Sequence, residues 1–360
     1  MVVCCENCHQ PYPETGFPFR CPACGGMYDY AQPPVFDSSR VDSSQPGMWR
    51  YRHTFDLPAD APVTYLGEGM TPLIRFAISG KQVGLKMESQ NPTGSYKDRG
   101  SAVLVSKLIS RGVKLDVEES SGNAGASFAA YAGCGGVKAR IYIPENAAGP
   151  KRLQIERQGA ELVRVAGPRS EAARAVLQDA ESGIPYASHA CIPFGLTGIA
   201  TMAYEIWETL QSAPGSVIAP VGHGGLLLGI MRGFQSLKNA GLITETPFYV
   251  GVQAANCSPM VEAYEHGKLE LNQYTEGWTL AEGVRVSKPA RGKALLQEMD
   301  HGTFIAIPEE EILPAFYELA RKGLYVEPTA ALGWSALVKL IHQLVEPIIV
   351  VLTGSGLKYI

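Results

Sequence analysis

Lys97 is the first residue whose position suggests chemistry. It lies in NPTGSYKDR, residues 91–99, where a Pro-Thr-Gly-Ser turn leads into a predicted helix over 98–111. The N-terminus of a helix carries partial positive charge, so a free ammonium group is unfavourable there. A lysine in such a place is useful when its nitrogen forms a covalent bond or serves as a base.

A glycine-rich loop follows the predicted strand SVIAP at 216–220. In PVGHGG, Gly222, Gly224 and Gly225 let backbone N–H groups converge, and the following helix adds its positive end. This pattern predicts an anion cradle, with phosphate as its natural occupant. It is not a dinucleotide fingerprint, because Leu227 stands where the last glycine would be. Close packing alone also explains the glycines.

Two other strand-to-helix junctions carry polar groups. SSGNAG at 120–125 follows the short strand LDVEE and opens a helix. Its serines are suitable helix caps, and the free N–H groups of the helix start could bind a carboxylate. Asn123 offers a side-chain amide. In LTGSGLK at 352–358, Thr353 places a hydroxyl at the end of a very apolar strand. A lysine, an anion cradle, an amide and a hydroxyl together predict a pyridoxal phosphate site.

The amino-terminal cysteines have the spacing of a metal site. Cys5-x2-Cys8 and Cys21-x2-Cys24 are separated by twelve residues. Two such pairs can place four thiolates around one tetrahedral zinc, with no position open for substrate, so the zinc would be structural. The alternative is a knuckle of reduced thiols without metal. Because five of the eight cysteines lie in the first 24 residues, a disulfide framework is not indicated.

The elements that must position these residues alternate along the chain. Short, nearly continuous apolar runs predict buried strands, and longer periodic runs between them predict helices. This alternation predicts parallel sheet, with ligands at the carboxyl ends of strands. The expected strands are 83–87, 139–143, 161–165, 216–220, 247–251 and 347–352, and the further helices are 123–132, 170–182, 197–211, 226–239, 308–321 and 329–343.

Composition narrows the function classes. A chain of 360 residues with 46% hydrophobic content has room for two domains, and a formal charge of −4 gives no basic surface for nucleic acid. No run approaches the length of a membrane helix, and the start does not resemble a signal peptide. We expect a cytoplasmic protein whose partners are small molecules.

In their order and spacing, these four junction motifs resemble the fold type II pyridoxal phosphate-dependent enzymes. Within them the chain resembles the threonine synthases, which carry a G-E-G-x-T-P-L segment, here residues 67–73, and often the cysteine pairs. The resemblance implies an α/β fold like the tryptophan synthase β subunit, with two three-layer αβα domains. It also implies a zinc ribbon at 1–30, a large domain from 31–100 and 205–360, a small mobile domain at 101–204, a cleft site and a homodimer.

The resemblance also implies roles for individual residues. Lys97 would form the Schiff base, Asn123 would contact the phenolic oxygen of the cofactor, and Thr353 would contact its ring nitrogen. The phosphate would be lined by Gly222, His223, Gly224, Gly225 and Leu226, and the substrate carboxylate would be held by Ser121, Gly122, Asn123 and Ala124.

Three positions bear on the substrate. The arginine expected for a substrate phosphate falls on Gly195, and His189 is a partial substitute or simply a histidine at a strand end. The segment LAEGVRVSKPARG at 280–292 resembles the corresponding segment of the ammonia-lyases. Glu282 is therefore a candidate substrate-binding carboxylate, or else a surface residue. The turn that begins at Glu327 is also similar to the family's sequence and opens a helix. The reactions left open are those of threonine synthase, a threonine or serine ammonia-lyase, and a β- or γ-replacement enzyme. The alternative outside catalysis is a silent partner subunit.

Overall fold

The computed structural model describes residues 2–147, 149–271, 274–275 and 277–359. The chain folds into two compact units. The first contains the chain up to Gly69, Asn91–Gly198 and Tyr359, and the second contains Met70–Gln90 and Ile199–Lys358. The division into domains expected from the sequence stays a prediction.

The second unit is built on a six-stranded sheet with strand order β10-β9-β8-β11-β4-β3. All neighbours are parallel except the β3–β4 hairpin. Since the four residues of β11 are all buried, the centre of this sheet is covered on both faces. The strands are β3 (Leu73–Ile78), β4 (Lys81–Lys86), β8 (Ser216–Pro220), β9 (Phe248–Ala254), β10 (Gly302–Ile307) and β11 (Ile348–Val351).

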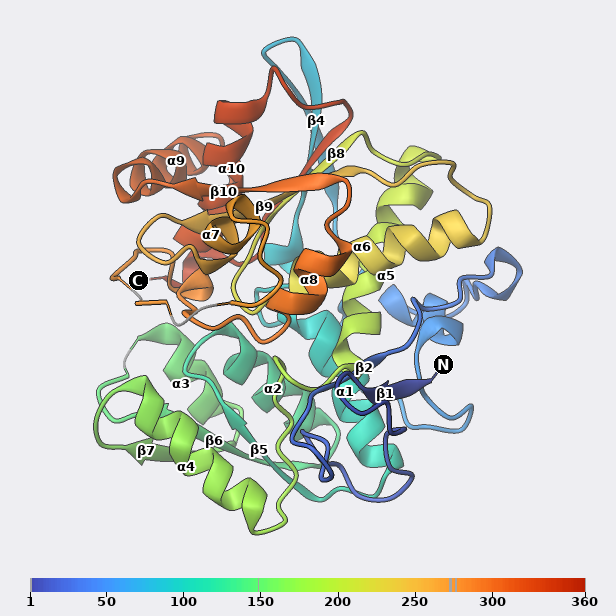
Figure 1. The fold of residues 1–360 in the computed structure, drawn as a ribbon, viewed down its shortest axis with the longest axis vertical. Helices are drawn as coiled ribbons and strands as arrows, with labels where there is room; N and C mark the ends of the chain where they lie inside the picture. Colours follow the sequence, from blue (N-terminus) through green and yellow to red (C-terminus); the bar gives the residue numbers. More distant parts are fainter. Residues whose placement is uncertain (1, 148, 272–273, 276, 360) are drawn as a thin grey trace. The chain divides into compact units, whose positions relative to one another are not determined.

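Helices cover this sheet. α10 packs on β8, β9, β10 and β11, whereas α6 packs on β8; in Figure 1, α9 and α10 lie to the left of the sheet and α6 to the right. The helices of this unit are α6 (Gly225–Asn239), α7 (Pro259–Glu265), α8 (Gly292–Glu298), α9 (Glu309–Arg321) and α10 (Pro328–Leu340). α5 (Phe194–Leu210) begins in the first unit and ends in the second.

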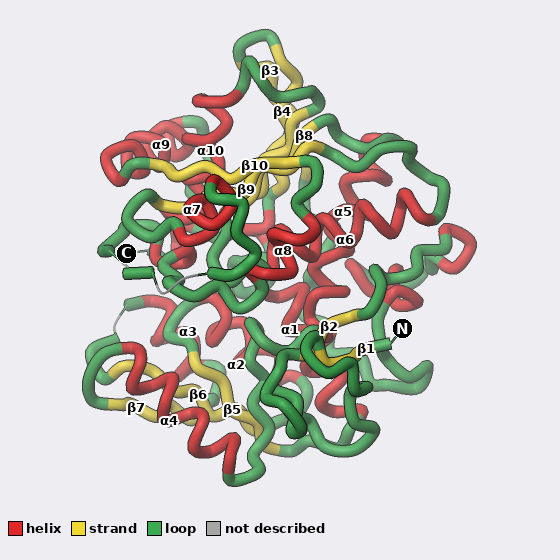
Figure 2. The backbone as a smooth tube through the Cα atoms, in the orientation of Figure 1, coloured by secondary structure: helices red, strands yellow, loops and turns green. Residues whose placement is uncertain are grey.

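The first unit contains a parallel three-stranded sheet in the order β5-β6-β7, coloured yellow in Figure 2. The strands are β5 (Leu115–Glu119), β6 (Lys138–Pro144) and β7 (Glu161–Val165), and the helices are α1 (Lys97–Ser110), α2 (Asn123–Cys134), α3 (Pro150–Arg157) and α4 (Arg169–Glu181). Val117 and Tyr142 pack against Ala172 and Val176 of α4. Ile141, one residue away, joins the α1 and α2 side chains on the opposite face.

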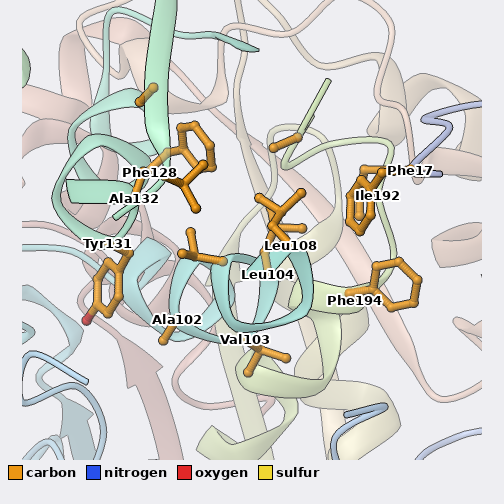
Figure 3. Close-up of a cluster of buried hydrophobic side chains, with 14 of the residues drawn as sticks. Phe17, Ala102, Val103, Leu104, Leu108, Phe128, Tyr131, Ala132, Ile192 and Phe194 are labelled. Carbon is orange, nitrogen blue, oxygen red and sulfur yellow. The ribbon is translucent and has the colours of Figure 1, made fainter. Parts of the chain in front are cut away.

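The core of the first unit forms around α1 (Figure 3). Leu104 and Leu108 lie at its centre, with Phe128 of α2 on one side and Phe194 on the other. The amino-terminal segment, with its small antiparallel sheet of β1 (Val3–Cys5) and β2 (Tyr28–Tyr30), belongs to this core. The ring of Tyr12 packs edge-on against Phe194 with centroids 5.1 Å apart.

The predicted strands and helices are confirmed within a few residues, apart from β9, which extends to Ala254. The elements that the sequence did not indicate are β1, β2, β3, β10, α3, α7 and α8. In the part of the chain that the structure describes, no helix is both long and apolar enough to cross a membrane.

Candidate active site

The turn before Lys97 is fixed by a buried aspartate. Gly94, at a φ of +84°, donates its N–H to the Asn91 carbonyl over 2.7 Å. Asp98 accepts hydrogen bonds from both the backbone N–H and the hydroxyl of Thr93, at 2.7 and 2.6 Å. As predicted, Lys97 stands at the beginning of a helix, as the first residue of α1. The residue is only partly buried, so its side chain remains accessible to solvent. Its backbone is held in place by the hydrogen-bonded turn.

Ser95, two residues before Lys97, adds a buried hydroxyl group to this turn. Its side chain is fully buried, and its hydroxyl has no hydrogen-bond partner among the residues that the structure describes. Buried hydroxyl groups are nearly always hydrogen-bonded in native proteins. The Ser95 hydroxyl can therefore hydrogen-bond to a ligand bound beside the lysine turn.

The SSGNAG junction folds differently from the predicted serine cap. Gly122 occupies the N-cap position of α2, with no side-chain cap bond, and its N–H donates to Ser120 Oγ over 3.2 Å. A Cβ at Gly125 would lie 2.1 Å from the Ser120 carbonyl oxygen, so the chain must fold back tightly here. Asn123 is partly buried and begins the helix, whose first N–H groups lack partners within the helix itself.

His189 is hydrogen-bonded to a carboxylate that the sequence interpretation missed. Its Nδ1 lies 2.5 Å from Glu118 Oε1; the His189 side chain is 22% exposed and the Glu118 side chain 1% exposed. Burial raises the pKa of Glu118 well above its ordinary value, Glu119 and Asp116 raise it further, and the charge of Lys97 lowers it. The structure thus brings Lys97, Glu118 and His189 together in the first unit.

The glycine loop is in the second unit. Gly224 is the N-cap of α6 at a φ of +92°, a left-handed conformation that favours glycine. A Cβ at Gly222 would lie 2.7 Å from the Gly283 carbonyl oxygen. The Arg291 N–H donates to the His223 carbonyl over 2.9 Å. Close packing therefore explains Gly222, while the loop still presents the free N–H groups of a helix start.

Thr353 follows β11 in the same unit. It is 2% exposed, and its hydroxyl has no hydrogen-bond partner within the described ranges. Gly354 accepts the Glu327 N–H over 2.9 Å, and a Cβ at Gly354 would lie 2.3 Å from a Glu327 carboxylate oxygen. The buried carboxylate of Glu327 therefore lies beside the threonine loop.

Glu282 is exposed at the start of a short 3-10 helix, Glu282–Val284. Its neighbour Gly283 donates its N–H to Thr329 Oγ1 over 3.1 Å and approaches the glycine loop at Gly222. The Glu282 segment, the α10 start and the glycine loop are therefore brought together, although the Glu282 carboxylate itself is solvent-exposed.

Gly195, where an arginine was expected, lies against backbone. A Cβ there would lie 3.1 Å from the Gly100 carbonyl oxygen, and at Gly198 it would lie 2.0 Å from that of Arg99. The start of α5 thus crosses α1 at a separation that side chains do not allow. This packing gives a physical reason for glycine at position 195.

The four predicted zinc ligands are close together. The sulfur atoms of Cys5, Cys8, Cys21 and Cys24 all lie within 4.8 Å of one another. Cys5 and Cys24 are separated by 3.4 Å, and Cys8 and Cys21 by 3.6 Å. A Cβ at Gly26 would lie 2.7 Å from Cys5 Sγ, so the turn leaves room for the sulfurs only because glycine is there.

Sequence reasoning missed Glu118, Thr329 and Arg291. Arg291 is 1% exposed although it is charged. A signal existed for Glu118 only, because the predicted strand LDVEE carries three acidic residues where a buried strand should be apolar. The contacts of Thr329 and Arg291 join segments far apart in sequence and leave no local pattern.

Known proteins with similar sequences are pyridoxal phosphate enzymes, as the junction motifs predicted. Residues 64–354 match the family described as "Pyridoxal-phosphate dependent enzyme". The threonine synthase of Methanocaldococcus jannaschii is 33% identical over 377 aligned positions, covering 99% of this chain and 93% of the relative. For that of Methanosarcina acetivorans the identity is 29%, with 98% and 91% covered.

Solved structures agree on the fold. A threonine deaminase from T.th. superposes with a TM-score of 0.69 at 27% identity, covering 79% of this chain and 92% of its own. Maize serine racemase superposes with a TM-score of 0.70 at 20% identity, covering 79% of this chain and 88% of its own. At this identity it shows the fold alone. The expected α/β architecture is confirmed, and the chain belongs to the pyridoxal-phosphate dependent enzyme family.

Proposed function

We propose that this enzyme converts O-phosphohomoserine and water into threonine and phosphate, the threonine synthase reaction. The observation that carries the proposal is the similarity to threonine synthases along nearly the whole chain. The turn that holds Lys97 supports the cofactor part of it. So do the buried hydroxyls of Ser95 and Thr353, which have no hydrogen-bond partner among the described residues.

The residues present fit pyridoxal phosphate. Lys97 would bind it covalently, the N–H groups from Gly222 to Leu226 would bind its phosphate, and Asn123 and the Thr353 hydroxyl would hold the ring oxygen and the ring nitrogen. Bound there, the cofactor would supply an electron sink for negative charge on the substrate carbon next to the amino group.

The chain's own groups would then orient the substrate and move protons. The N–H groups of residues 121–124, at the start of α2, suit the substrate carboxylate. Lys97 Nζ, once displaced by the substrate amine, would take the α-proton as general base. Phosphate would leave from the γ carbon and water would add at the β carbon, which balances the reaction.

We also propose that the small domain, residues 101–204, moves during turnover. We further propose that the enzyme is cytoplasmic and forms a homodimer. Gel filtration of the purified protein tests for the dimer.

A second reaction is favoured by one specific observation, the backbone packing at Gly195, which suits an enzyme without a phosphate-binding arginine at that position. The superposition on a threonine deaminase suits the same reaction. Threonine or serine would then lose water, and hydrolysis of the resulting imine would take up one water and release a keto acid and ammonia. The exposed Glu282 would act in substrate recognition in this case, and Glu282→Gln would raise the KM for threonine.

Separate incubations distinguish the two reactions. The loaded enzyme is mixed with O-phosphohomoserine, threonine, serine, O-acetylserine or O-acetylhomoserine, and phosphate, threonine and keto acids are measured. Equal amounts of phosphate and threonine from the first substrate support threonine synthase. Keto acid from threonine, with no turnover of O-phosphohomoserine, refutes it. Lys97→Ala should lose visible cofactor absorption and turnover, whereas Lys114→Ala, at an exposed lysine, should keep both.

We further propose that the four cysteines bind one structural zinc. Zinc–sulfur bonds of about 2.3 Å in a tetrahedron place sulfurs about 3.8 Å apart, near the separations found here. Metal analysis of the purified chain should find about one zinc, Cys8→Ser should lose it and Cys4→Ser should keep it. A metal-free wild-type chain with normal stability would contradict this proposal.

A further inference from the structure

The buried acidic residues of β5 have no role in the assignments above. Asp116, Glu118 and Glu119 fall on three of the five residues of a strand in which the side chains from Asp116 onward are buried. Glu119 is paired with Arg169 at 3.1 Å, and Asp116 Oδ1 accepts the Ala187 N–H over 2.8 Å. These two carboxylates are held by an arginine and by a backbone N–H, whereas the partner of Glu118 is a titratable imidazole, that of His189.

Side-chain alternation fixes the direction in which Glu118 points. Val117 packs against α4, so Asp116 and Glu118 point to the opposite face of the sheet, where α1 and α2 pack. Lys97 is the first residue of α1. Its charge acts on the Glu118 carboxyl. The carboxyl group is thus buried on the side of the sheet that carries the reactive lysine.

The contacts of Glu118 are unequal at its two oxygens. Oε1 is bonded to His189 Nδ1 at 2.5 Å, while Oε2 has no partner among the described residues. Of the two residues, only His189 reaches solvent to a notable extent, at 22% against 1%. A proton can therefore enter or leave the buried carboxyl through the imidazole.

Among the described residues, the charged and titratable groups that interact with Glu118 are Asp116 on the same face of its strand, Lys97 on α1, and His189 and Tyr186 on the segment after α4. The charge of Glu119 also acts on it, although that side chain points to the other face. Lys97 is the group that favours the ionised carboxylate through its own charge. The ionisation of Glu118 and the charge at the Lys97 nitrogen are therefore linked.

We propose that Glu118 and His189 form a positioning pair that balances the charge on the nitrogen of Lys97. When that nitrogen is positive, Glu118 is a carboxylate and accepts the Nδ1–H of His189. When the nitrogen becomes neutral, the buried carboxylate loses its stabilising charge and the pair takes up a proton through the imidazole. This inference rests on the assignment of Lys97 as the cofactor lysine, but not on the identity of the substrate.

The test is a pH titration of the visible absorption of the cofactor-loaded enzyme, without substrate. Glu118→Gln removes the negative charge, so the absorption midpoint should move to lower pH by about one unit or more. His189→Gln should move it in the same direction, because the carboxyl group then stays protonated. The double variant should move it no further than either single variant, since both changes remove one pair.

Glu161→Gln is the matched control, since it makes the same change of charge on β7 of the same sheet, at an exposed carboxylate paired with Arg140. Its midpoint should stay near that of the wild type. An unshifted midpoint in both Glu118→Gln and His189→Gln, or an equal shift in Glu161→Gln, would overturn the inference and leave the proposed reaction untouched. A wild-type enzyme without visible absorption would instead overturn the cofactor lysine, and this inference with it.

Discussion

The carboxylate of Asp98 accepts hydrogen bonds from both the backbone N–H and the hydroxyl of Thr93, so that the residue after Lys97 closes the turn before it. The side chain is fully buried. Two charge-assisted bonds at one carboxylate hold the turn more firmly than neutral bonds would. The direction of Lys97 therefore depends on a residue that does not itself take part in the chemistry.

Asp98→Ala should lower kcat by about 100-fold. Without the hydrogen-bonded turn the lysine nitrogen would be displaced by about 1 Å, and a displacement of that size costs about this much in rate. Steady-state kinetics with the best substrate measure it, and the cofactor absorption shows whether the lysine still reacts. Asp42→Ala is the control, since Asp42 makes the same two bonds to Ser44 on an exposed loop. Equal kcat values for Asp98→Ala and wild type would contradict the role given to this turn.

Gly198→Ala should destabilise the enzyme by about 3 kcal/mol or more, because the new Cβ would lie 2.0 Å from the Arg99 carbonyl oxygen and α5 would have to move away from α1. Denaturation in urea, followed by circular dichroism, measures the change. Gly133→Ala is a control in an exposed helical position, where the nearest atom lies at 3.3 Å. A stable Gly198→Ala variant would show that the two helices are not in backbone contact.

The sequence predicted the parts of the site that follow local rules. Lys97, the glycine loop and Thr353 lie at strand-to-helix junctions, where turn residues and apolar periodicity are visible in a short window. β10 was not predicted, because GTFIAI is an apolar run with a single glycine before it and no pattern that distinguishes strand from helix. The serine cap was wrong, because the tight return at Gly125 places Gly122 at the N-cap instead.

The contacts of His189 and Gly195 were harder to predict, for a different physical reason. The bond from Glu118 to His189 joins residues 71 positions apart, and the contact of Gly195 with Gly100 joins two helices. Such pairings depend on the packed fold, so no window of sequence contains them. The charged strand LDVEE was the one local sign, since buried carboxylates must find partners.

A buried ion pair in the second unit allows a test of how this fold tolerates charge. Lys86 Nζ lies 2.6 Å from Glu205 Oε2, and both side chains are 2% exposed. Glu205→Gln should destabilise the protein by about 3–5 kcal/mol, because it leaves a buried ammonium without its counter-charge. Lys86→Met combined with Glu205→Leu should be less damaging than the single change. Urea denaturation of the three proteins measures this, and a more damaged double variant would refute it.

Asp116 gives a pH dependence of stability whose sign can be worked out. Burial raises the pKa of this carboxyl well above 3.8, although the N–H groups of Ala187 and Val117 oppose the shift. The folded state therefore keeps a proton that the unfolded chain loses, and stability falls as the pH rises from the ordinary pKa through the raised one. Asp116→Asn removes this loss and can still accept the Ala187 N–H. Its urea midpoint should equal that of the wild type below about pH 4 and exceed it at neutral pH; parallel curves across this range would show that Asp116 is ionised in the folded protein.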